Sequence, residues 1–114
     1  MTDVYGIKNC GTVKKALNWL DENGIEYTFH DYKKEGVDET KLKSWVKELG
    51  WESLLNRRGL TWRKLSDEEK SGINQGNAIK IMLEKPSIIK RPLIIANREK
   101  LLGFDEDEYQ KFFD

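Results

Sequence analysis

A strand, a helix and a second strand succeed one another within the first 32 residues, and this order constrains the fold more than any other feature of the sequence. Residues 4–7 form a short apolar run that predicts a strand, and residues 25–32 alternate apolar and polar side chains as a second strand would. Between them, the apolar residues of 13–20 recur at the spacing of one helical face, and Asn23-Gly24 supplies a stop signal. Two strands joined by a helix over so short a length pair in parallel with a right-handed crossover. We therefore predict an α/β fold that opens with a βαβ unit.

The C-terminal part of the sequence predicts a second pair of strands followed by a helix. Residues 93–96 form a β-rich run, and residues 100–104 can pair with it across a turn at Asn97-Arg98. Because these strands are close in sequence, we expect an antiparallel hairpin, which makes the whole sheet mixed and four-stranded (βαβ…ββα). Asp105 then opens a last helix. Its aromatic residues would dock on the sheet: Tyr109, Phe112 and Phe113.

The middle of the sequence has a helical pattern over approximately residues 37–86. Asp38 is a candidate N-cap for a helix that stops at Gly50, and the segment that begins at Ser66 matches a capping box. A further amphipathic run closes the segment. Because the length of the chain fits one domain, we expect a single domain, residues 1–114, into which this helical segment is inserted.

The composition narrows the class of protein. The 20 basic and 20 acidic residues cancel to a formal net charge of zero, which argues against wholesale binding to nucleic acid or to an acidic membrane surface. No stretch approaches the roughly 18 apolar residues of a membrane span, and the first residues show no basic segment followed by an apolar run. One cysteine cannot form an internal disulfide, and one cysteine with one histidine does not make a metal-ligand set. We expect a cytoplasmic protein without a secretion signal, metal, nucleic-acid partner or membrane partner.

Cys10 is the residue best placed to carry chemistry. It follows the first strand and immediately precedes the first helix, where unpaired backbone N–H groups and the helix dipole favour a thiolate over a thiol. Lys8 and Lys14 are near in sequence, and the hydroxyl of Thr12 could donate a hydrogen bond to the sulfur. A lone cysteine is most often a small buried apolar residue. The polar loop of residues 8–12 nevertheless favours the reactive interpretation.

Two other cysteine chemistries do not fit the sequence. A cysteine phosphatase loop needs an arginine six residues after the nucleophile, and that position holds Ala16. A papain-like pair needs a histidine base, and the one candidate is His30. Because His30 lies at the end of the second strand, we expect it to have a surface or packing role.

Arg91 and Pro92 immediately precede the third predicted strand, and two interpretations of them stay open. X-Pro bonds are the usual place for a cis peptide, often in a functional tight turn. In a thioredoxin-like layout, a cis-proline here would face the cysteine, and Arg91 would stand beside the sulfur and bind an oxyanion or a carboxylate. Alternatively, Arg91 is a solvated edge residue and Pro92 a trans residue that opens the strand.

A basic segment over residues 56–65 contains Arg57, Arg58 and Trp62. It could wrap an anionic ligand, and arginine beside tryptophan also suits single-stranded nucleic acid. The balanced net charge makes a solvated loop the default interpretation.

Taken together, these residues resemble the arsenate reductase-related (ArsC/Spx) family, and most closely its YffB-type branch. The resemblance runs over almost the whole chain. Its landmarks stand in this order: Tyr5-Gly6-Ile7-Lys8-Asn9-Cys10 with Thr12, His30-Asp31-Tyr32, Leu54-Leu55-Asn56 with Arg58-Gly59 and Thr61-Trp62-Arg63-Lys64-Leu65, Ile88-Ile89-Lys90-Arg91-Pro92-Leu93, and Leu101-Leu102-Gly103-Phe104. Any one of them is weak, but the whole set in order is specific.

The resemblance implies a thioredoxin-like fold with an inserted helical subdomain. Cys10 matches the nucleophile of the family, Gly11 and Thr12 continue its active-site loop, and Arg91 and Pro92 match its arginine and cis-proline. Family arsenate reductases attack arsenate with this cysteine and complete the reduction with glutathione and glutaredoxin. The YffB-type branch is thought to comprise glutathione-dependent thiol reductases.

The sequence departs from the pattern of the family at three positions. Arsenate reductases carry an arginine at each of two positions where this chain has Asn56 and Gly103. The nearest arginine to the first position is Arg57, one residue later. A three-arginine cage is therefore incomplete, which favours a thiol or disulfide substrate over arsenate. The transcriptional branch, which contacts RNA polymerase, usually has a second cysteine where this chain has Val13. An internal disulfide switch is thus excluded, whereas cysteine-independent binding to a partner is not.

The leading hypothesis is a glutathione-dependent thiol/disulfide oxidoreductase in which Cys10 forms a mixed disulfide with a small-molecule or protein thiol substrate. Free glutathione or glutaredoxin would release the product, and Arg91, with Arg57 or Arg58, would hold the carboxylates of glutathione. Two alternatives are an arsenate reductase coupled to glutathione and glutaredoxin, and an Spx-like regulatory module that contacts RNA polymerase.

Overall fold

The computed structural model describes all residues, 1–114, and the chain divides into two compact units. The first unit is built from Met1–Glu35 and Arg91–Asp114, and the second from Gly36–Lys90. The first unit contains the sheet, and the second is almost entirely helical. No helix in either unit is long and apolar enough to span a membrane.

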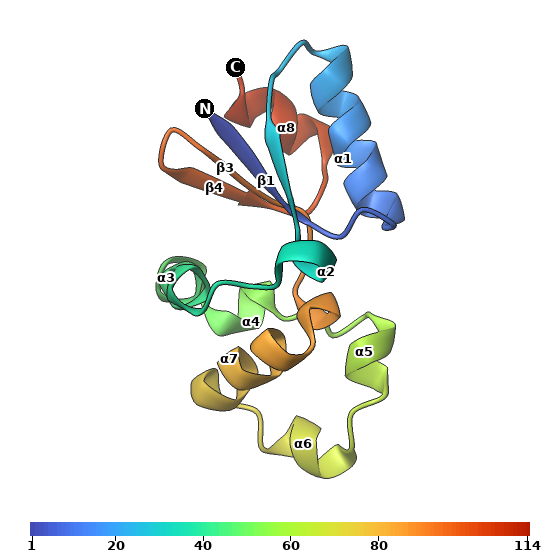
Figure 1. Ribbon diagram of the computed structural model, residues 1–114, viewed down its shortest axis with the longest axis vertical. Coiled ribbons are helices and arrows are strands. Elements are labelled where there is room, and N and C mark those ends of the chain that lie inside the picture. The colour runs from blue at the N-terminus through green and yellow to red at the C-terminus, as the bar shows by residue number, and fades with distance from the viewer. The chain divides into compact units, whose positions relative to one another are not determined.

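A mixed four-stranded sheet forms the first unit (Figure 1). Its strands are β1 (Thr2–Gly6), β2 (Thr28–Asp31), β3 (Leu93–Ala96) and β4 (Glu99–Leu102), in the order β2-β1-β3-β4. Strand β1 pairs in parallel with β2 and antiparallel with β3, and β3 pairs antiparallel with β4. The parallel opening pair and the C-terminal hairpin are both confirmed.

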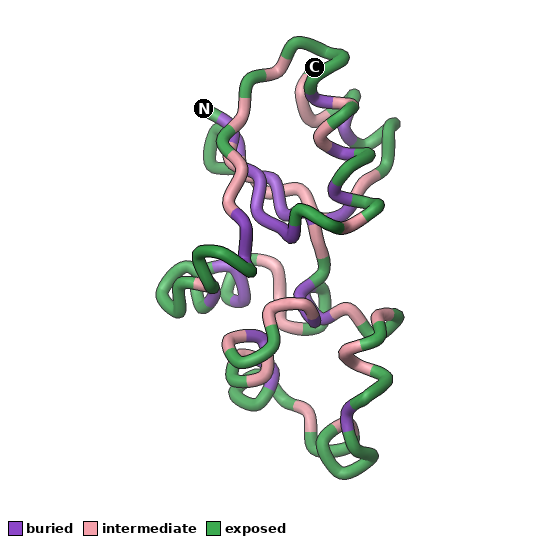
Figure 2. Tube along the Cα trace, turned by 45° about the vertical axis from the view of Figure 1, so that its right-hand side comes forward, coloured by how far each residue is buried: buried purple, intermediate pink, exposed green.

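Two helices cover one face of this sheet, namely α1 (Gly11–Glu22) and α8 (Glu106–Phe112). In the sheet register Val4 stands opposite both Phe29 and Ile94, so the three side chains share that face. Figure 2 shows buried positions along the strands and at intervals along these helices. The buried core cluster consists of Val4, Ala16, Leu20, Ile94 and Tyr109, with Phe112 and Phe113 packed against it. The predicted docking of the last helix is therefore confirmed.

Strands β2 and β4 are shorter than the sequence predicts. Strand β2 begins only at Thr28, and after Asp31 the chain turns into a short helix, α2 (Tyr32–Glu35). Strand β4 ends at Leu102, because Gly103 adopts a φ of 85° and turns the chain out of the sheet. The hairpin turn lies at Asn97-Arg98, where both residues have positive φ, 52° and 69°, as a two-residue turn between twisted strands requires.

The second unit contains the helices α3 (Glu39–Leu49), α4 (Trp51–Leu54), α5 (Leu60–Arg63), α6 (Asp67–Ser71) and α7 (Gln75–Glu84), and a 3-10 turn, η1 (Pro86–Ile88). Asp38 caps α3 by accepting a hydrogen bond from the N–H of Lys41 at 3.1 Å, and Ser66 and Glu69 form the predicted capping box of α6. The segment expected as a solvated loop contains the short helix α5. The inserted helical subdomain is confirmed.

Tyr109 of α8 links the helix to the residue that follows the C-terminal end of β4. Its side chain is fully buried, and its hydroxyl donates a hydrogen bond to the carbonyl oxygen of Gly103 at 2.5 Å. The ring makes edge contacts with Trp19 and Phe104, at centroid distances of 5.4 and 4.9 Å. Burial raises the pKa of the Tyr109 phenol, so the hydroxyl keeps its proton and remains a donor.

Replacing Tyr109 by Phe should destabilise the protein, because the buried carbonyl of Gly103 loses its donor while the ring contacts remain. We expect the free energy of unfolding to fall by about 1–3 kcal/mol. Urea denaturation followed by tryptophan fluorescence measures it. The matched control is Tyr27→Phe, where the partly exposed hydroxyl near Asp21 can exchange its partner for water, and the expected loss is below about 0.5 kcal/mol. Equal losses in the two variants would contradict the stabilising role of the buried bond.

Candidate functional site

Cys10 occupies the N-cap position of α1, with extended φ and ψ of −125° and 128°. Its carbonyl oxygen accepts the first intrahelical hydrogen bond, from the N–H of Lys14 at 2.9 Å. The residue is half-buried and its thiol is free. Helix N-termini leave backbone N–H groups without an intrahelical partner, so the sulfur lies where negative charge is stabilised.

The electrostatic surroundings of Cys10 lower the pKa of its thiol below the ordinary value. Burial acts in the opposite direction, and it is the largest single influence. It is outweighed by the backbone N–H of Val13, the positive charge of Arg91, the backbone N–H of Thr12 and a hydrogen bond from the Arg91 side chain. The net result is a cysteine with enhanced thiolate character.

The groups that act on the sulfur differ from those that sequence proximity indicates. Thr12 acts through its backbone N–H and not through its hydroxyl, and Lys8 and Lys14 are absent from the groups that shift the pKa. The N–H of Val13, which periodicity marks only as a core residue, has the largest favourable effect. A helix places the amides of its first turn around the N-cap side chain. The predicted position of Cys10 at the N-terminus of the helix was therefore the sequence feature that could have indicated the effect of the Val13 amide.

Arg91 stands beside Cys10, at the entry to β3, and its bond to Pro92 is cis. The interpretation of Arg91 as a solvated edge residue is therefore wrong, since its guanidinium hydrogen-bonds the sulfur. Arg91 also lies near the buried Tyr32, whose phenol it acts on electrostatically. Pro92 is fully buried, and its carbonyl oxygen accepts the N–H of Gly103 at 2.8 Å.

Gly6, at the end of β1, is a site residue that the sequence reasoning missed. A Cβ atom at Gly6 would stand 3.0 Å from Cγ2 of Val13 and 3.7 Å from Cβ of Arg91. The missing side chain thus leaves room for the first turn of α1 and for Arg91 to approach the strand. The only feature of the sequence that could have indicated Gly6 is its position shortly before Cys10. The close approach of another segment to a strand glycine depends on residues far along the chain, here Arg91.

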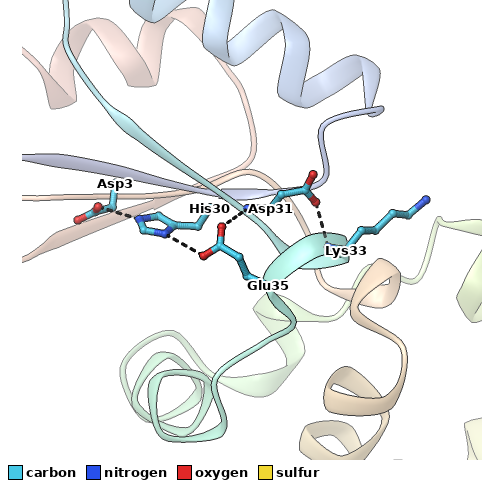
Figure 3. Close-up of polar contacts among 5 residues, drawn as sticks. All are labelled: Asp3, His30, Asp31, Lys33 and Glu35. Atoms are coloured by element: carbon cyan, nitrogen blue, oxygen red, sulfur yellow. Dashed lines mark hydrogen bonds and ion pairs between the residues drawn. The ribbon is translucent and has the colours of Figure 1, made fainter.

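His30 of β2 contacts the carboxylate side chains of two other residues (Figure 3). Its Nε2 atom contacts Oδ1 of Asp3 at 2.9 Å, and its Nδ1 atom is 3.7 Å from Oε1 of Glu35. The ring stacks on Tyr5 at a centroid distance of 4.4 Å. These contacts agree with the expected packing role.

Arg57 and Arg58 belong to the second unit. The guanidinium of Arg57 lies over the rings of Trp51 and Trp62, at 5.9 and 5.5 Å from their centroids. The backbone N–H of Arg58 donates to Oδ1 of Asn56 at 3.1 Å, which organises the turn before α5. Both side chains are exposed, and their part in ligand binding stays a prediction. No group of three or more His, Cys, Asp or Glu residues is arranged to hold a metal ion.

Replacing Arg91 by Met should raise the pKa of the Cys10 thiol, because both the positive charge and the hydrogen bond to the sulfur are lost. In the parent protein, alkylation by iodoacetamide should rise with pH through a midpoint below that of an unstructured cysteine. The variant should shift this midpoint upward and slow alkylation at pH 7 by roughly threefold or more. Lys14→Met is the control and should leave the profile unchanged, since Lys14 does not act on the sulfur. Identical profiles for the parent and Arg91→Met would exclude the electrostatic role of Arg91.

Similarity to known proteins extends over nearly the whole chain. A model of the ArsC family matches residues 5–112. An uncharacterized protein of Haemophilus influenzae is 44% identical over 113 residues, which cover 99% of each chain. The global transcriptional regulator Spx 2 of Bacillus anthracis is 28% identical over 115 residues, which cover 98% of this chain and 86% of the regulator.

The solved structure of a YFFB protein superposes on this chain with a TM-score of 0.92 and 45% sequence identity, over 97% of each chain. The mixed sheet, the cysteine at the start of α1 and the helical insertion are thus accompanied by a match of sequence and of structure over the same length. The chain belongs to the ArsC family and has the thioredoxin-like fold of that family.

Proposed function

We propose that this protein is a glutathione-dependent thiol/disulfide oxidoreductase that works through a mixed disulfide on Cys10. The observation that supports this most directly is the lowered pKa of the Cys10 thiol, produced by helix-terminal amides and Arg91. A thiolate is the attacking species in thiol–disulfide exchange, and a thiol with its pKa near the ambient pH attacks best. Membership of the ArsC family is consistent with this chemistry.

The reaction runs in two exchange steps. The Cys10 thiolate attacks the glutathione sulfur of a glutathionylated thiol, so a Cys10–glutathione disulfide forms and the substrate sulfur leaves as a thiolate that takes up a proton. A second glutathione, which loses its proton, attacks the glutathione sulfur of this mixed disulfide. Glutathione disulfide leaves and the Cys10 thiolate is restored. One disulfide is reduced and one is formed, so the electrons balance without a bound cofactor.

The residues around Cys10 have separate tasks in this scheme. Gly11 is exposed, and nothing lies within 4 Å of where its Cβ would be, so an incoming sulfur has an open approach. The amides of Thr12 and Val13 stabilise the thiolate as nucleophile and as leaving group. Arg91 binds a carboxylate of glutathione in addition to its contact with the sulfur, and Pro92 fixes the main chain beside it.

The single thiol determines what must complete the cycle. With Cys10 as the only cysteine, no resolving thiol is available within the chain. A second glutathione molecule, or a glutaredoxin, therefore has to release the enzyme. The substrate is a small-molecule or protein thiol in its oxidised form.

A regulatory role is a second candidate, and the relative named Spx 2, a global transcriptional regulator, favours it. In this role the chain would contact RNA polymerase through its folded surface. Val13 stands where the redox switch of the transcriptional branch has its second cysteine, so binding would not depend on an internal disulfide. If Cys10→Ser left polymerase binding and the cellular phenotype intact, the regulatory role would replace the enzymatic one.

Incubation with glutathione disulfide should attach one glutathione to Cys10, because the thiolate is accessible and activated. Intact-mass spectrometry at pH 7 should show a single adduct of about 305 Da (one glutathione less one hydrogen) that reduced glutathione removes, as thiol–disulfide exchange requires. Cys10→Ser should show none. A parent protein that stays unmodified over hours at neutral pH would refute the proposal.

Arsenate should be a poor substrate. Only Arg91 of the implied arginine cage is among the groups that act on Cys10, and Gly103 holds a φ of 85° that side-chain-bearing residues rarely adopt. In an assay coupled to glutathione, glutaredoxin and NADPH consumption, we expect turnover of a glutathione mixed disulfide to exceed turnover of arsenate by about tenfold or more. Comparable rates would favour the arsenate reductase alternative.

A further inference from the structure

We propose that a cavity beside the Cys10 loop binds the γ-glutamyl end of glutathione. This assignment rests on the proposed function, because it names where one end of the co-substrate lies. The cavity has a volume of about 270 Å³. It is lined by Ile7, Lys8, Asn9, Asp31, Lys33 and Lys34, all in the first unit.

The sheet register explains why these residues converge. Gly6 at the end of β1 stands opposite Asp31 at the end of the parallel strand β2. Because parallel strands end at the same edge of a sheet, the segment that follows β1 and the segment that follows β2 leave the sheet together. The first leads through Lys8 to Cys10, and the second leads through Asp31 to Lys33. The cavity therefore lies against the loop that leads to Cys10, and Asn9, the residue before the cysteine, is part of its lining.

Asp31 is a fixed, mostly buried group in this cavity. Its residue is 8% exposed, and its Oδ1 atom accepts the backbone N–H of Lys33 at 2.9 Å. Figure 3 shows the side chains of Asp31 and Lys33 pointing to the opposite side from His30 and Asp3. The side chain of Asp31 thus belongs to the cavity, while its backbone N–H donates to Oε2 of Glu35, a neighbour of His30, at 3.3 Å.

The charges of the cavity match one end of glutathione better than the other. Three lysines and one aspartate are among its lining residues, namely Lys8, Lys33, Lys34 and Asp31. The γ-glutamyl end of glutathione carries a carboxylate and an ammonium on one carbon atom, whereas the glycyl end carries a carboxylate alone. The lysines pair with the γ-glutamyl carboxylate and Asp31 pairs with the γ-glutamyl ammonium, which leaves Arg91 for the glycyl carboxylate.

The dimensions agree with this assignment. From the cysteinyl sulfur to the α-carbon of the γ-glutamyl group, an extended glutathione spans about 8 Å. The Cα atoms of Lys8 and Cys10, two residues apart, are separated by at most about 7 Å. A glutathione joined to Cys10 can therefore place its γ-glutamyl end in the cavity. The volume lies just below the range for small-molecule sites, which suits part of the tripeptide and not all of it.

The first experiment compares how fast Cys10 reacts with three disulfides: those of glutathione, γ-glutamylcysteine and cysteinylglycine. We expect the first two to react about tenfold faster than the third, which lacks the γ-glutamyl group. The combined variant Lys8→Gln, Lys33→Gln and Lys34→Gln should lose this preference and keep the parent rate with iodoacetamide. The matched control, Lys14→Gln with Lys15→Gln and Lys111→Gln, removes the same charge from exposed positions outside the cavity and should keep the preference.

Asp31→Asn separates specific recognition from general attraction of anions. Asparagine retains an oxygen that can accept the N–H of Lys33, so the local turn is preserved. If Asp31 binds the γ-glutamyl ammonium, the rate with glutathione disulfide should fall about tenfold. If the cavity only attracts negative charge, removing a carboxylate should raise that rate, and this result would overturn the assignment.

The second experiment needs no redox chemistry. S-methylglutathione is titrated into Cys10→Ser, and backbone amide shifts are followed by NMR. We expect shifts at Lys8, Asn9, Lys33 and Lys34, and their loss in the variant that also lacks the three cavity lysines. If these shifts appear but Cys10 of the parent protein does not react with glutathione disulfide, the proposed function is rejected and the cavity assignment is retained. If Cys10 reacts but neither the shifts nor the preference among disulfides is seen, the cavity assignment is rejected and the proposed function is retained.

Discussion

The parallel pairing of β1 with β2, together with the antiparallel pairing of β1 with β3, brings the segments that carry Cys10, Asp31 and Arg91 to one edge of the sheet. Strand β1 leads into Cys10, β2 ends at Asp31, and β3 starts just after Arg91. A strand end and the start of an antiparallel neighbour meet at the same edge, as do the ends of two parallel strands. The register Gly6 with Asp31 and Tyr5 with Leu93 fixes this meeting to within one residue.

The chemistry at Cys10 depends on a balance of opposed effects. Burial of the sulfur disfavours its charge, and alone it would make the thiol less reactive. Two amides and one guanidinium outweigh burial, so the net shift of the Cys10 pKa is downward. The low dielectric of a half-buried site strengthens these favourable interactions. Each favourable contribution requires close approach to the sulfur. The missing side chain of Gly6 permits that approach for both α1 and Arg91.

The same edge of the sheet explains how a chain with zero net charge can present a positive site. Arg91 acts on the sulfur of Cys10 and three lysines line the cavity next to Asn9, whereas the first turn of α8 carries acidic residues. Overall charge thus says little about local recognition. In the proposed reaction, a thiol substrate with two carboxylates would meet a favourable field at this edge, where its sulfur would exchange with Cys10.

Local interactions were predictable from the sequence, and interactions between distant segments were not. The N-caps at Asp38, Ser66 and Asp105 and the turn at Asn97-Arg98 were identified correctly, because each depends on residues within a few positions of one another. Cys10 was placed at a helix N-terminus for the same reason. The ends of β2 and β4 were misplaced, because α2 begins at Tyr32 directly after β2 and the positive φ of Gly103 ends β4.

The position of Arg91 was left open by the sequence, as were the close approach at Gly6 and the convergence of Asp31 with Lys8. All three depend on which strands become neighbours and in what register, and this pairing brings Arg91 to Gly6, which lies 85 positions earlier in the chain. The amino-acid sequence by itself determined the helices, strands and caps and indicated Cys10 as the candidate nucleophile. Only the tertiary structure decided which charges reach its sulfur, because electrostatic effects depend on distance in space and not on distance along the chain.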